Sequence, residues 1–112
     1  FLSETEARRT AVALNYAVDI FENIGSLDFS DVNVSSGKIF STSQLSEFEL
    51  ESANSGSERE TITGKIGTYE VILSIENYRN SNVVKIIYLS ISYPISKNNS
   101  DRVELQRIKK IT

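Results

Sequence analysis

The chain has 112 residues, which is the size of one small domain and leaves no room for a second. Its 15 Asp and Glu outnumber its 12 Lys and Arg, and the formal charge of −3 argues against a basic nucleic-acid-binding module, because phosphate contacts require a cationic surface. Cysteine and histidine are both absent, which excludes disulfides, Cys/His zinc sites, thiolate nucleophiles and Ser-His-Asp catalysis.

The first predicted element is a helix within residues 1–24. No Gly or Pro interrupts the stretch from Ser3 to Ile24, and Ser3 followed by Glu6 fits a capping box. Gly25 comes directly after this stretch and fits the C′ position at which many helices stop. The sequence therefore predicts one helix of about 20 residues.

Residues 25–67 are expected to form a variable loop region with short strands. All five glycines of the chain lie in this segment, which is also rich in Ser, Asn and Glu. Its apolar residues occur in short pieces, such as Lys38–Phe40 and Phe48–Leu50. Long loops are uncommon in compact domains and often carry function, so this segment is a candidate binding region.

Residues 68–112 are expected to form an antiparallel sheet. Apolar and polar residues alternate from Tyr69 to Glu76, Val83–Tyr93 is apolar on both faces, and Arg102–Ile108 alternates less regularly, as in an outer strand. Short turn-like connections join these segments into a meander. The predicted fold of residues 1–112 is a single α+β domain, with a long N-terminal helix packed on a three- to four-stranded antiparallel meander.

The predicted helix is more apolar than a small sheet requires. At 100° per residue, a narrow stripe is continued by further apolar residues into an arc of about 220°, whereas a helix covering one sheet needs little more than about 100°. Either a curved sheet and the long loop cover this excess, or the stripe packs against other subunits. The candidate subunit-packing face consists of Ala7, Ala11, Leu14, Val18 and Phe21.

Two parts of the chain resemble a known family. Ala7–Ile24, with spaced alanines and an apolar-Glu-x-Ile ending, is similar to the exposed half of the type IV pilin helix. Val84–Pro94 followed by Arg102–Leu105 is similar to the closing strands of minor pilins and type II secretion pseudopilins. The order of helix, variable loop and meander therefore resembles the globular part of the type IV pilin-like superfamily.

This resemblance implies a structural minor subunit of a type IV pilus, a secretion pseudopilus or a DNA-uptake system. Such a subunit assembles through its N-terminal helix with other pilin or pseudopilin subunits, lies outside the cytoplasm at the cell surface or in the periplasm, and carries no active site or cofactor. Mature pilins begin with Phe and have Glu at the fifth position of an apolar segment, whereas Phe1 is followed here by polar residues with Thr5 at the fifth position. We therefore expect that a membrane-anchoring segment precedes this chain in its natural form.

The alternative is a stand-alone extracytoplasmic binding or adhesion domain that uses the 25–67 loop. Asp28, Asp31 and Asn33 have the spacing of oxygen ligands for calcium, but they match no EF-hand loop and fit ordinary turn chemistry better.

Two clusters of charge are expected to be solvated surface. An acidic stretch runs from Glu47 to Glu60, and a carboxylate pair in it would suit glycosidase chemistry, but no substrate-binding aromatic set accompanies it. The C-terminus is basic, with Arg102, Arg107, Lys109 and Lys110. An outer strand protected by charge explains this segment more simply than a nucleic-acid site, because no aromatic residue follows Tyr93.

Overall fold

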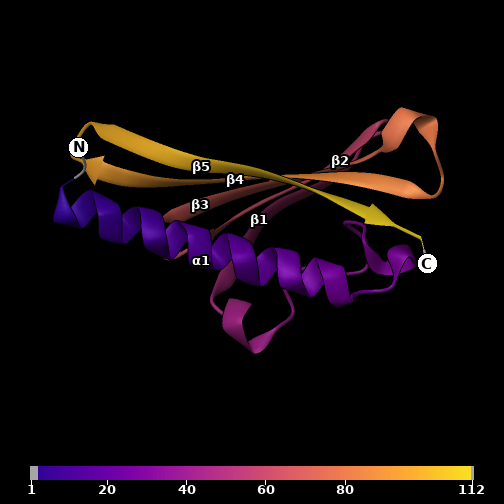
Figure 1. The fold of residues 1–112 in the computed structure, drawn as a ribbon, viewed down its shortest axis with the longest axis horizontal. Helices are drawn as coiled ribbons and strands as arrows, with labels where there is room; N and C mark the ends of the chain where they lie inside the picture. The colour runs from indigo at the N-terminus through magenta and orange to yellow at the C-terminus, as the bar shows by residue number, and fades with distance from the viewer. Residues whose placement is uncertain (1–2, 112) are drawn as a thin grey trace.

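A computed structural model describes residues 3–111 (Figure 1). One helix, α1 (Glu4–Ser26), precedes a single antiparallel sheet whose five strands follow one another in chain order. The α+β class, with one N-terminal helix on an antiparallel sheet, is confirmed, but the expected number of strands was too low. The strands are β1 (Phe48–Ser55), β2 (Arg59–Ile66), β3 (Tyr69–Asn77), β4 (Val84–Ser96) and β5 (Asn99–Lys110).

The additional strands form a hairpin inside the segment that was expected to be mainly loop. A bulge between Leu50 and Ser52 interrupts the alternation of β1, nearly all of which is exposed. In β2, Gly64 occupies a core-facing position between Ile62 and Ile66, so that the apolar pattern has a gap. A bulge and a core-facing glycine thus conceal both strands from a search for period-two alternation.

Helix α1 begins as expected but ends differently. The hydroxyl oxygen of Ser3 accepts a hydrogen bond from the Glu6 backbone N–H, which is the predicted N-cap. Gly25 lies inside the helix, and positive φ angles occur in the described residues at Gly37, Gly67 and Arg79 instead. The Leu27 N–H closes the helix on the carbonyls of Asn23 and Ile24, so no left-handed glycine is needed there.

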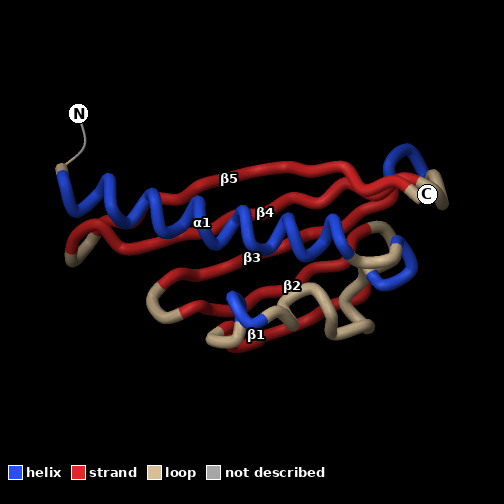
Figure 2. Tube along the Cα trace, turned by 60° about the horizontal axis from the view of Figure 1, so that its bottom comes forward, coloured by secondary structure: helices blue, strands red, loops and turns tan. Residues whose placement is uncertain are grey.

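The helix and the following loop share one face of the sheet (Figure 2). Helix α1 packs mainly on β4 and β5, while residues 27–47 cover the β1–β2 side. Three residues of this loop, Val32, Ile39 and Leu45, are fully buried and continue the core that the helix builds with Ile20 and Ile24. We call the layer that α1 and this loop form on one face of the sheet the inner layer. The long segment after the helix is therefore an ordered part of it.

Two lysines of the sheet donate hydrogen bonds to the last turn of α1 and to the loop that follows it. Lys85 on β4 and Lys109 on β5 are cross-strand partners. The Lys109 ammonium donates to the Gly25 carbonyl, 3.0 Å away, in the last turn of α1, which has no basic residue of its own. The Lys85 ammonium donates to the Val32 carbonyl at 2.7 Å, and burial lowers its pKa. The Lys109 cation at the Gly25 carbonyl complements the negative end of α1, whereas Lys85 holds the loop that follows it.

No helix in residues 3–111 combines the length and the apolar character needed to cross a bilayer.

Candidate assembly surface

One flank of α1 carries an uncovered apolar stripe. Ala7, Ala11, Leu14 and Val18 are all exposed, with Leu14 41% and Val18 51% accessible. Their spacing of four, three and four residues keeps them within about 60° of arc and extends them over about 16 Å of helix. We call these four residues the helix stripe. It is the part of the predicted packing face that lies open on the surface.

Phe21 does not belong to the helix stripe. Its side chain is 6% exposed, and the guanidinium carbon of Arg107 lies 5.4 Å from its ring centre. On the helix, Phe21 lies only about 20° from the exposed Leu14, so the cover by Arg107 on β5, rather than its angular position, buries it. The open stripe therefore ends at Val18, and Phe21 joins the core.

The opposite flank of α1 is occupied. The rings of Tyr16 and Tyr69 on β3 meet edge to face with centres 5.4 Å apart, and Tyr69 lies 5.7 Å from Tyr93. Burial, followed by the neighbouring Tyr16, raises the pKa of Tyr69. The Tyr93 hydroxyl shares a hydrogen bond of 2.7 Å with Thr10. The helix thus contacts β3 through Tyr16 and is open on the side that faces the β5 edge.

The basic C-terminal residues lie along β5, the edge strand beside the helix stripe. Arg107 covers Phe21, Lys109 holds the end of α1, and Arg102 pairs with Glu104 at 2.9 Å. Lys110 is exposed at the end of β5. By the alternation of β5, Arg107 and Lys109 face the helix side and give this edge a basic border next to the apolar helix flank, whereas Arg102 and Lys110 face the outer side of the sheet.

The acidic residues of the hairpin do not form a site. Glu60 accepts a hydrogen bond from the Val34 N–H at 3.0 Å and so holds the covering loop. Glu51 lies 3.6 Å from Lys65. Glu47, Glu49 and Glu58 are exposed along the β1 side of the molecule. These carboxylates give that side a negative surface.

The three candidate calcium ligands, Asp28, Asp31 and Asn33, do not converge on one point in the structure but have separate surroundings. Asp31 pairs with Lys38 at 3.1 Å. Asn33 accepts from the Ser36 N–H at 2.8 Å and donates to the Ser30 carbonyl, which is turn chemistry, and Asp28 is exposed. Within residues 3–111, no three His, Cys, Asp or Glu residues are grouped in a way that would hold a metal ion.

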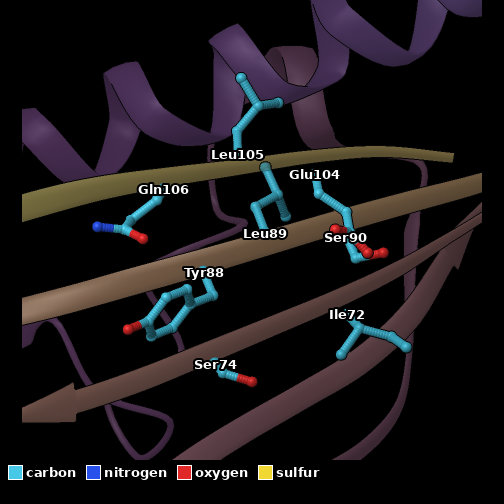
Figure 3. Close-up of a pocket in the computed structure, with 8 residues that line it drawn as sticks. All are labelled: Ile72, Ser74, Tyr88, Leu89, Ser90, Glu104, Leu105 and Gln106. Carbon is cyan, nitrogen blue, oxygen red and sulfur yellow. The ribbon is translucent and has the colours of Figure 1, made fainter.

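A shallow groove of about 390 Å³ crosses the outer face of the sheet (Figure 3). Leu105 points toward α1, whereas Tyr88 lies on the opposite face with the groove. Glu76 pairs with Arg59 at 3.0 Å, and its hydrogen bond to the Tyr88 hydroxyl raises the pKa of that group. The groove is an open surface across neighbouring strands, where Ile72 and the Tyr88 ring lie among polar side chains. On this face it is lined by Ile72, Ser74, Tyr88, Ser90, Glu104 and Gln106.

A second, apolar pocket of about 220 Å³ lies at the β1 edge, between the covering loop and the hairpin. Leu50 at its rim is 62% exposed, although it lies on the inner face of the sheet opposite Gly64. We call this pocket the Leu50 notch. Its apolar lining includes Val34, Ile39, Phe40, Phe48, Leu50, Ala53 and Ile62. Sequence reasoning missed it, and the only signal was the short apolar piece Phe48–Leu50.

Comparison of the chain with protein-family models, with curated proteins and with solved structures finds no match.

Proposed function

We propose that this chain is a structural subunit, a minor pilin or pseudopilin, of a type IV pilus or a type II secretion pseudopilus. It assembles through the open flank of α1 with other subunits outside the cytoplasm. The observation that carries the proposal is the helix stripe, in which Leu14 and Val18 are about half exposed, while on the opposite flank of the same helix Tyr16 packs against Tyr69.

The helix stripe is a candidate interface because its four apolar residues form one continuous row. Single exposed apolar residues are common on soluble proteins, but a continuous apolar row on one helix marks a surface that another element can cover. Full burial of a Leu or Val side chain stabilises by about 1.5–3 kcal/mol, so covering the exposed part of Leu14 and Val18 supplies a favourable term for each contact. In a filament this term recurs in every subunit.

The helix stripe can be tested by charge substitution. Leu14→Lys and Val18→Lys should prevent recovery of the chain in sheared filaments or pseudopili, while the far-UV circular dichroism of the purified chain stays unchanged. Ile72→Lys is the matched control, because Ile72 is 45% exposed on the outer face of the sheet. Normal assembly of both helix variants would overturn the proposal.

The natural reading frame upstream of Phe1 supplies an independent test. About 20 consecutive apolar residues, which is the length that spans a bilayer, preceded by a processing site would support the filament class. A start codon a few residues upstream, with no apolar segment, would contradict it.

The alternative function, a binding or adhesion domain that uses residues 25–67, is favoured by the Leu50 notch, which opens within that segment. In that case Leu50→Lys should abolish binding to cells or surfaces, and the helix variants should have no effect.

A further inference from the structure

The helix stripe and the Leu50 notch lie in the same layer of the molecule. Helix α1 lies over the β4–β5 side of the sheet and residues 27–47 lie over the β1–β2 side (Figure 2). The helix stripe borders the β5 edge, and the notch is lined by Leu50 and Ala53 of the β1 edge. A shift of one copy sideways along the sheet therefore brings the stripe of one molecule against the notch of the next.

The two sides also carry opposite charge. Residues 47–66 contain five acidic and two basic side chains, whereas residues 99–111 contain four basic and two acidic ones. On the solvent side of the stripe, helix α1 carries Glu22 and the ion pair of Glu4 with Arg8, so the complementary charge comes from β5. Opposite potentials favour encounter of unlike sides and disfavour contact of two like sides.

We propose that a second copy of this chain docks its helix stripe into the Leu50 notch. This proposal rests on the proposed function and names the surface that receives the helix. Leu14 and Val18 bury against Leu50 and the neighbouring aromatic residues, while the basic border of β5 faces the acidic side of β1. The two surfaces differ, so the contact is head to tail and each docked copy leaves a free stripe and a free notch for further copies.

The contact is made by side chains rather than by joining of the sheets. The bulge between Leu50 and Ser52 disrupts the free edge of β1, and Arg and Lys residues line the free edge of β5. Both are features that prevent backbone pairing between sheet edges. The open apolar surfaces beside these edges remain available for docking.

Cysteine cross-linking tests this contact, because these 112 residues contain no cysteine of their own. Val18→Cys and Leu50→Cys variants, distinguished by a size tag, are mixed and mildly oxidised. Gln106→Cys, exposed on the outer face of the sheet, is the control, and Ala53→Cys is a second position in the notch. Disulfides form only between nearby, correctly oriented cysteines, so the yield reports the contact itself.

We expect the mixture of the Val18 and Leu50 variants to give several-fold more mixed dimer than either variant gives alone or with the Gln106 control. The yield should fall at high salt, which screens the charges. Dominant cross-linking of Val18→Cys to itself, without reaction at Leu50 or Ala53, would overturn this inference and leave helix-mediated assembly standing. Absence of any cross-link at Val18 would overturn both proposals.

Discussion

The ring of Phe48 on β1 occupies the space above Gly64 on β2. A Cβ atom added at Gly64 would lie 2.6 Å from a ring carbon of Phe48 and 2.5 Å from the Glu49 carbonyl oxygen. Phe48 also stacks on Phe40, with ring centres 3.8 Å apart. Because Leu50 lies directly opposite Gly64, it has no cross-strand side chain to pack against, which explains its exposure.

This arrangement predicts that Gly64→Ala destabilises the chain. The new methyl group must displace the Phe48 ring or the backbone, and overpacking of this kind costs about 1–3 kcal/mol. Gly25→Ala is the matched control, since a Cβ at this helical position meets nothing within 4 Å, and it should stabilise by about 0.4–1 kcal/mol. Urea unfolding of both variants measures the difference, and equal stabilities would contradict the packing described for Phe48.

Asn23 provides a second test of the inner layer. Its amide group donates to the carbonyls of Lys38 and Ile39 from a buried position on α1. Asn23→Ala leaves these carbonyls without that donor and should reduce the free energy of unfolding by about 1–3 kcal/mol. Asn15→Ala, the same change on the exposed face of α1, should be close to neutral. Hydrogen exchange should also become faster in residues 38–45 of the Asn23 variant alone, and unchanged exchange there would argue against this link.

The raised pKa of Tyr69 predicts that the chain loses stability at alkaline pH. Burial raises the pKa of the Tyr69 hydroxyl above its ordinary value of about 10, so the unfolded chain releases this proton first. The stabilising contribution is therefore complete below about pH 10 and is lost as the pH rises through the raised value.

The measurement is urea unfolding of the wild type and of Tyr69→Phe between neutral and strongly alkaline pH. The lowered pKa of Lys85 acts in the opposite direction in both proteins, so the difference between them isolates Tyr69. The wild type should lose stability more steeply above about pH 10. Parallel curves would show that Tyr69 does not titrate differently in the folded state.

Removing the Lys85 ammonium should weaken the attachment of the covering loop, residues 27–47, to the sheet. Lys85→Met keeps much of the side chain's length but removes the donor to the Val32 carbonyl and the cation that lies 4.5 Å from the Phe29 ring centre. We expect a loss of about 1.5–3 kcal/mol in unfolding free energy, as for other hydrogen bonds to charged groups. Lys65→Met, which affects an exposed pair with Glu51, should change stability by less than about 1 kcal/mol. A loss of the same size in both variants would contradict the special role of Lys85.

The sequence was most informative where one physical signal was strong. The glycine-free stretch with its Ser3 cap predicted α1, the apolar alternation of Tyr69–Glu76 predicted β3, and the dense apolar run Val83–Tyr93 predicted β4. The sequence predicted only short strands within residues 25–67. The full β1–β2 hairpin was missed because its stability comes from pairing with β3 and from the covering loop, while its own residues include a bulge and Gly64. The helical wheel placed Phe21 beside Val18. Only the position of β5 shows that Arg107 covers Phe21 and leaves Val18 exposed.

The most direct test of the central claim is the reactivity of one thiol on the helix stripe. Val18→Cys is introduced into the full natural chain, and its rate of alkylation is measured in the assembled filament or pseudopilus and in detergent-dispersed subunits. Gln106→Cys on the outer face serves as the control. If the helix stripe is the subunit interface, assembly should slow alkylation at position 18 strongly and leave position 106 little changed. Equal rates at position 18 in the assembled and dispersed states would contradict the account.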